Sequence, residues 1–153
     1  MKTKQCLIVY ASMSGNTEEM ARNIGVGIQD SGVAVEIKDI LEADTFELQN
    51  YNGILLGAYT WDNGSLPDEF LDFYEEMDSL DLTGKIAAAF GSCDSFYQDR
   101  GKAVDTLMEK LTERGADVVL DGLKIDLAPT PAEKEQCIQY GRAFVEKLIK
   151  SND

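Results

Sequence analysis

The sequence contains no histidine among its 153 residues. This absence excludes Ser-His and Cys-His catalytic pairs, and it excludes every metal site that requires an imidazole ligand. Cysteine is scarce as well. Cys6, Cys93 and Cys137 are an odd number without Cys-x-x-Cys spacing, so neither a disulfide framework nor a zinc knuckle is expected. Reduced thiols of this kind suit a cytoplasmic protein, and we expect that location.

The sequence also has few basic residues and no long apolar run. There are 14 basic and 28 acidic residues, which gives a net charge of -14. The resulting negative electric field repels nucleic acid and anionic membranes, and it favours either a basic protein partner or simply solubility. No apolar run is long enough to span a bilayer, and the one near the N-terminus is too short for a signal peptide. We therefore expect no nucleic-acid partner and no membrane.

Strand and helix patterns alternate along the chain. Strands are predicted at 6–10, 33–39, 52–58, 85–90 and 118–127. Helices are predicted at 17–28, from Pro67 onward, at 101–114 and at 131–150, with a further helical turn at 45–48. The last of these helices is expected to begin with a capping box over Thr130 to Glu133. This alternation indicates an α/β protein with a doubly wound five-stranded parallel sheet and helices on both faces. The length fits a single domain over residues 1–153, and 2-1-3-4-5 is one of two common strand orders.

The turn after the first predicted strand carries most of the polar chemistry. It reads Ser12-Met13-Ser14-Gly15-Asn16-Thr17 and leads into a helix. Free N–H groups at a helix N-terminus suit a phosphate, although ordinary helix capping explains the same residue types. The turn lacks the lysine of a nucleoside-triphosphate loop, and the Gly-x-Gly-x-x-Gly dinucleotide fingerprint is absent. A phosphate here would be held by neutral donors, which suits a tightly bound monophosphate.

Two further loops would meet this turn at the carboxyl ends of the strands. Residues 58–64 contain Trp61, the only tryptophan, and residues 91–100 contain Phe96 and Tyr97. A phosphate turn beside two aromatic loops favours a planar heteroaromatic phosphate, with its ring stacked on Trp61. Tyr59 and Phe96 fit better as residues that cap the hydrophobic core or mark a protein interface.

At these three loops the sequence resembles the flavodoxins of the short-chain type. The resemblance rests on S-x-S-G-N-T at 12–17, T-W-D at 60–62 and C-D-S-F-Y at 93–97, and it extends over nearly the whole chain. It implies the 2-1-3-4-5 strand order, one tightly bound FMN, and electron transfer between redox proteins without substrate turnover. The expected partners are a basic reductase or acceptor, such as a flavin reductase or a haem protein, and a monomer is expected.

The resemblance also implies a role for each matching residue. Residues 12–17 would hold the phosphate, Trp61 and Tyr97 would lie on the inner and outer faces of the flavin, and the backbone of the second and third loops would meet its polar edge. No catalytic residue and no metal ligand is expected. The cofactor-binding residues are Ser12, Met13, Ser14, Gly15, Asn16, Thr17, Thr60, Trp61, Asp62, Asn63, Ser92, Cys93, Asp94, Tyr97 and Asp99.

One position departs from the family pattern. Several flavodoxins have a glycine after the inner aromatic residue, which lets a peptide flip toward the reduced flavin, whereas this chain has Asp62. A positive φ costs a non-glycine residue about 1 kcal/mol or more. Asp62 and Asp94 would also disfavour the anionic, fully reduced ring, so a low-potential electron donor is expected. The docking face for a partner is expected at Asp62, Asp68, Glu69, Asp94 and Asp99.

Three other functions compete with this reading. A receiver domain needs carboxylates at the ends of strands 1 and 3, and none is present there. A cysteine phosphatase needs a Cys-x5-Arg loop, but Cys93 and Arg100 are one residue too far apart. A small FMN-dependent NAD(P)H quinone or nitro reductase remains open, because it would share the flavin site.

Overall fold

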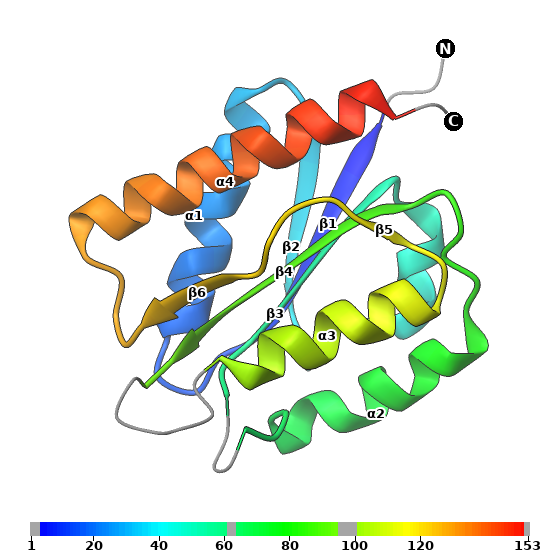
Figure 1. The fold of residues 1–153 in the computed structure, drawn as a ribbon, viewed down its shortest axis with the longest axis horizontal. Helices are drawn as coiled ribbons and strands as arrows, with labels where there is room; N and C mark the ends of the chain where they lie inside the picture. The colour runs from blue at the N-terminus through cyan, green and yellow to red at the C-terminus, as the bar shows by residue number, and fades with distance from the viewer. Residues whose placement is uncertain (1–3, 61–63, 95–100, 152–153) are drawn as a thin grey trace.

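The computed structural model describes residues 4–60, 64–94 and 101–151. Its centre is a parallel sheet of order β2-β1-β3-β4-β5, in which β6 also pairs with β4 (Figure 1). The strands are β1 (Gln5–Ala11), β2 (Ala34–Asp39), β3 (Gly53–Ala58), β4 (Ile86–Cys93), β5 (Asp117–Val118) and β6 (Leu123–Asp126). The α-helices are α1 (Asn16–Asp30), α2 (Asp68–Glu76), α3 (Lys102–Glu113) and α4 (Pro131–Lys150). Two 3-10 helices, η1 (Thr45–Asn50) and η2 (Met77–Ser79), complete the order. The predicted doubly wound fold and its strand order are confirmed.

Helices cover both faces of the sheet because successive strand residues point to opposite sides. Leu7 of β1 belongs to a core cluster that includes Phe70 of α2 and Leu107 of α3. The next residue, Ile8, belongs to a second cluster that includes residues of α1 and α4. In Figure 1, α1 and α4 accordingly lie together on one side of the sheet, and α2 and α3 lie on the other.

Helix starts follow the predicted capping chemistry in one case and shift by a residue in another. Thr130 and Glu133 form the predicted capping box at the start of α4. Pro67 was expected inside the first turn of α2. Its φ of -58° is compatible with a helix, but its ψ of 145° is extended, so Pro67 is the N-cap and α2 begins at Asp68.

The fifth strand is not continuous, which corrects the prediction of one strand over 118–127. It is divided into β5 and β6, and both pair with β4. At the interruption, the Tyr140 hydroxyl lies 3.2 Å from the carbonyl oxygen of Ala89 and 2.8 Å from that of Asp121. A side chain from α4 thus bonds a β4 carbonyl that lies beside the break.

The fourth strand is longer than predicted. Because Leu123–Asp126 of β6 pair with residues 90–93, β4 continues to Cys93. Ser92 and Cys93 were expected in a loop starting at 91, but they are strand residues. The third loop therefore begins at Asp94, and Ser92 occupies a fixed place in the sheet.

Candidate functional site

The three central strands of the parallel sheet, β1, β3 and β4, end at the same edge. Ala11 at the end of β1 pairs with Ala58 at the end of β3, and β4 runs alongside β3. The chain leaves β1 between β2 and β3, which is the point where the strand order reverses. Ligands of doubly wound proteins bind beyond the carboxyl ends of the strands at this point. The turn at 12–17 lies there.

The turn presents backbone donors at the start of α1. Gly15 is the N-cap residue, with φ 89° and ψ -5°, a left-handed conformation that glycine adopts without steric cost. In the part of the chain that the structure describes, no acceptor binds the N–H groups of residues 13–17. Met13, Ser14 and Gly15 are also exposed. These donors, at the positive end of the helix dipole, fit a phosphate.

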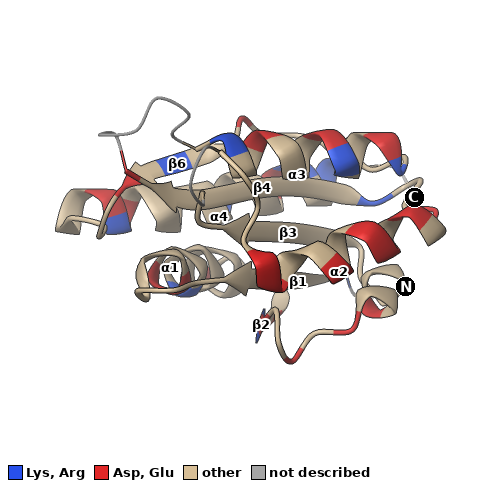
Figure 2. Cartoon of the chain, turned by 90° about the horizontal axis from the view of Figure 1, so that it is seen from below, with Lys and Arg blue, Asp and Glu red and all other residues tan. Residues whose placement is uncertain are grey.

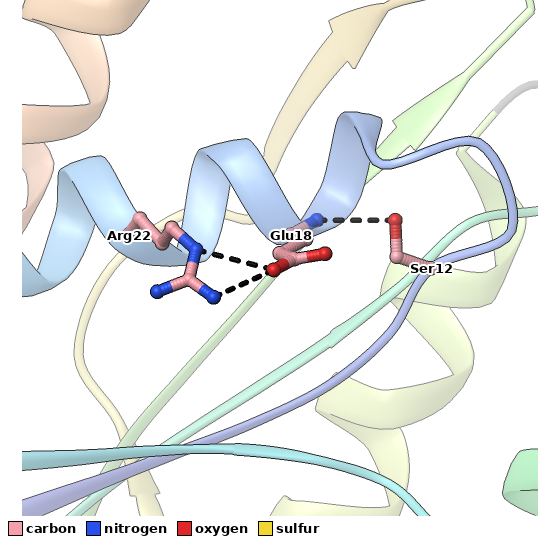
Figure 3. A network of polar contacts seen from close by, with 3 residues as sticks. All are labelled: Ser12, Glu18 and Arg22. Carbon is pink, nitrogen blue, oxygen red and sulfur yellow. Dashed lines mark hydrogen bonds and ion pairs between the residues drawn. The ribbon is translucent and has the colours of Figure 1, made fainter.

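Ser12 and Arg22 are both bonded to Glu18, and neither brings a free positive charge to the turn. The Ser12 hydroxyl oxygen accepts a hydrogen bond from the N–H of Glu18 at 3.2 Å. The Arg22 guanidinium donates to Oε2 of Glu18, at 2.6 Å from Nη2 and 3.2 Å from Nε (Figure 3). These bonds raise the pKa of Arg22 above its usual value. The nearest cation of α1 is therefore paired with a carboxylate, as expected for a phosphate held by neutral donors.

Hydrogen bonds among Thr17, Ser92 and Thr60 link the beginnings of the three loops. The hydroxyl oxygens of Thr17 and Ser92 are 2.8 Å apart, and the Ser92 N–H donates to Thr17 Oγ1 at 3.3 Å. The carbonyl oxygen of Ser92 accepts a bond from the N–H of Thr60, also at 3.3 Å. Thr60 Oγ1 in turn accepts from the N–H of Ala103 at the start of α3. The structure thus brings together one predicted residue from each loop.

Cys93 and Asp94 lie at the end of β4 and are half-buried. Cys93 Sγ lies 3.6 Å from the carbonyl oxygen of Ile125, and the Cys93 carbonyl accepts from the Leu127 N–H at 2.7 Å. Leu127 has a φ of 57°, which is uncommon for a residue other than glycine. Sequence reasoning did not single out Leu127, and no pattern in the sequence signals its backbone conformation.

Tyr59 plays the core-capping role expected for it. Its ring packs against the core cluster on the α2 and α3 side of the sheet. Its hydroxyl donates to the Glu69 carboxylate, with a closest distance of 3.0 Å. Burial is the main cause that raises the pKa of Tyr59 to about 12, and the hydrogen bond to Glu69 is the second cause.

Five predicted contacts fall outside the described residues. They are Trp61, Asp62, Asn63, Tyr97 and Asp99, and the expected core residue Phe96 also lies outside. Their roles stay predictions. Over residues 4–60, 64–94 and 101–151, no cluster of three carboxylate or cysteine side chains is placed to hold a metal ion. No helix in those ranges has the length and apolarity needed to cross a bilayer.

The fold defines a class, the doubly wound proteins that bind ligands at the strand switch point, and the turn there offers neutral donors that fit a phosphate. Within that class, residues 8–141 match the family model described as Flavodoxin. The chain is 45% identical to probable flavodoxin 2 of Bacillus subtilis (strain 168) over 142 residues, which cover 92% of this chain and 94% of that protein. It is 35% identical over 145 residues to a flavodoxin of Maridesulfovibrio salexigens, covering 93% and 97%.

A solved structure gives the same result. The chain superposes on oxidised flavodoxin 1 from Bacillus cereus with a TM-score of 0.91 and 54% identity, over 94% of this chain and 98% of that one. The chain belongs to the flavodoxin family, whose members bind FMN and transfer electrons. The resemblance to short-chain flavodoxins is confirmed.

Proposed function

We propose that this protein is an electron carrier that passes electrons from a reductase to acceptor redox proteins and turns over no substrate of its own. The observation that carries the proposal is the turn at 12–17. Its N–H groups at 13–17 have no protein acceptor among the described residues, and it lies at the switch point of the sheet. FMN, when bound there, supplies one- or two-electron redox chemistry through its ring.

Each predicted residue has a place in this proposal. Residues 12–17 hold the phosphate through backbone N–H groups and hydroxyls, and the neutral donor set leaves the charge of the phosphate to the helix dipole. Thr60, Ser92, Cys93 and Asp94 border the ring from the ends of β3 and β4. Trp61 and Tyr97 cover the two faces of the ring, and Asp62, Asn63 and Asp99 meet its polar edge.

The acidic surface supports a basic partner. Helix α2 reads DEFLDFYEE, with no basic residue, and its first residues follow the second loop (Figure 2). A negative surface of this kind steers a positively charged reductase or haem protein toward the site. The same charge lowers the reduction potential of the bound flavin, because reduction adds negative charge. We further propose a cytoplasmic monomer in which residues 1–153 form a single domain.

Two measurements test the function. The flavin released from the purified protein is identified by chromatography, and FMN is the expected product, whereas FAD or no flavin would contradict the proposal. NADPH is then added to the purified protein. An electron carrier stays oxidised until a separate reductase is supplied, while reduction by NADPH alone would identify the alternative, a quinone or nitro reductase.

A further inference from the structure

The hydroxyl groups of Thr17 and Ser92 form a buried pair behind the phosphate turn. Thr17 is fully buried in the first turn of α1, and Ser92 is 6% exposed in β4. Their oxygens are 2.8 Å apart, and Thr17 Oγ1 also accepts from the Ser92 N–H. Across the described ranges, neither hydroxyl bonds to any other protein group.

The two hydroxyls carry one proton more than the described residues around them can accept. Each hydroxyl carries one proton, and only one of the two protons can lie between the two oxygens. Whichever hydroxyl donates, the proton of the other has no protein acceptor among the described residues. A buried donor without an acceptor is unfavourable. Within the described residues the pair therefore lacks one acceptor.

The positions of Thr17 and Ser92 indicate which of the two hydroxyl protons is available to a ligand. Thr17 belongs to the turn whose N–H groups at 13–17 lack acceptors among the described residues, so Thr17 is the member of the pair next to an anion bound at the turn. Ser92 lies behind it in the sheet. Its backbone is held on both sides, by its own N–H to Thr17 and by its carbonyl to the N–H of Thr60.

We propose that Ser92 is a positioning residue, which donates its hydroxyl proton to Thr17 and so directs the Thr17 proton to a phosphate oxygen at the turn. This inference rests on the proposed function. It assigns the Ser92 hydroxyl to phosphate recognition through Thr17 and leaves only the Ser92 backbone at the border of the flavin ring. Donation from Ser92 also polarises the Thr17 hydroxyl and makes it a stronger donor.

The test compares FMN with riboflavin, which lacks the phosphate. Apoprotein is titrated with each flavin by fluorescence quenching, and the ratio of the two dissociation constants is the readout. Ser92→Ala is expected to weaken FMN binding about fivefold and to leave riboflavin binding unchanged. In a Thr17→Val background, Ser92→Ala should not change the ratio further, because no Thr17 proton remains to be directed. Ser92→Cys keeps a weaker donor and should give an intermediate ratio.

Ser31→Ala is the matched control. The Ser31 hydroxyl donates to the Gly27 carbonyl at 2.9 Å at the far end of α1, so its loss should leave the ratio unchanged. Equal losses for FMN and riboflavin, an unchanged ratio in Ser92→Ala, or additive effects with Thr17→Val would overturn the positioning role. If Ser92→Ala does not fold, Ser92→Cys provides the comparison. Failure of the wild-type apoprotein to bind FMN would instead refute the proposed function itself.

Discussion

Ser12 and Ser14 are two residues apart in one turn, but their hydroxyls are in different situations. Ser12 already accepts a bond from the Glu18 N–H, while Ser14 is exposed and has no bonded partner in the described structure. Ser14→Ala should weaken FMN binding by about 1–3 kcal/mol, the worth of a bond to a charged group. It should change the unfolding free energy of the apoprotein by less than about 0.5 kcal/mol.

Ser12→Ala, in contrast, should lower the stability of the apoprotein. Removing the acceptor of the Glu18 N–H should lower the unfolding free energy of the apoprotein by about 1 kcal/mol, as for the loss of a helix cap. Urea unfolding and FMN titration of both variants measure the two quantities. A stability loss in Ser14→Ala that equals that of Ser12→Ala would contradict this division.

Gly15 offers a second comparison at the residue scale. Gly15 and Gly32 both have a φ of 89°, and an added Cβ would meet no heavy atom within 4 Å at either position. Alanine at each position should therefore cost a similar amount, about 1 kcal/mol or more, from the left-handed backbone alone. Only Gly15→Ala should also weaken FMN binding, because only Gly15 shapes the phosphate turn. Unchanged FMN affinity in Gly15→Ala would exclude a role for its backbone in the site.

At the scale of elements, η1 depends on a carboxylate with a lowered pKa. Glu47 pairs with Lys38 and accepts from the Asp44 N–H at 2.8 Å in a capping box, and the bond to Lys38 is the main cause of the lowered pKa. A lowered folded pKa contributes stability that is fully present above the ordinary value of 4.5 and is lost as the pH falls through the folded value.

Glu47→Gln should remove that contribution. At pH 7 the unfolding free energy should fall by about 0.2–1 kcal/mol through loss of the ion pair with Lys38, because the glutamine amide oxygen still accepts from the Asp44 N–H. The loss of stability between pH 5 and pH 3 should become shallower than in the wild type, as urea unfolding at several pH values would show. Glu42→Gln is the control, because Glu42 is exposed and its carboxylate has no bonded partner in the described ranges. The same pH slope in wild type and Glu47→Gln would refute the assignment.

Helices α1 and α4 meet at glycines. A Cβ on Gly141 would lie 2.1 Å from the carbonyl oxygen of Ile24, a backbone atom that cannot move alone. Gly141→Ala should therefore cost about 1–3 kcal/mol in unfolding free energy through overpacking. In Gly25→Ala the new Cβ would meet the terminal Cδ1 of Ile37, which can rotate away. That variant should lose less, and equal losses in thermal unfolding would contradict this difference.

Local patterns predicted most elements, but not the features made by contacts distant in sequence. Apolar periodicity and the capping box placed β1, α1 and α4 within a few residues, because those signals are local. The break between β5 and β6 coincides with the Tyr140 hydroxyl bonding across it, and no pattern near residue 120 encodes that contact. Likewise, the residues at 12–17 form a local motif, so the sequence alone predicts the phosphate turn. The bond between Thr17 and Ser92, 75 residues apart, depends on how α1 packs on β4.

The whole molecule carries a net charge of -14, and this excess acts at long range. The electron-transfer rate to a basic haem protein should fall as the ionic strength rises, because the Debye length shrinks to about 10 Å at 0.1 M. The rate to the ferricyanide anion should rise under the same conditions, because repulsion is screened. Stopped-flow measurements with both acceptors separate charge steering from a general effect of salt.

The position of the charge should matter as well as its amount. Asp68 is exposed at the start of α2, beside the second loop, while Asp117 is exposed at the start of β5, at the opposite ends of the strands. Asp68→Asn and Asp117→Asn change the net charge equally. If the partner docks near the flavin site, Asp68→Asn should slow transfer to the basic haem protein at low salt about twofold or more, and Asp117→Asn should have a smaller effect. Equal effects of the two variants would mean that the overall charge attracts the partner without directing it to the carboxyl ends of the strands.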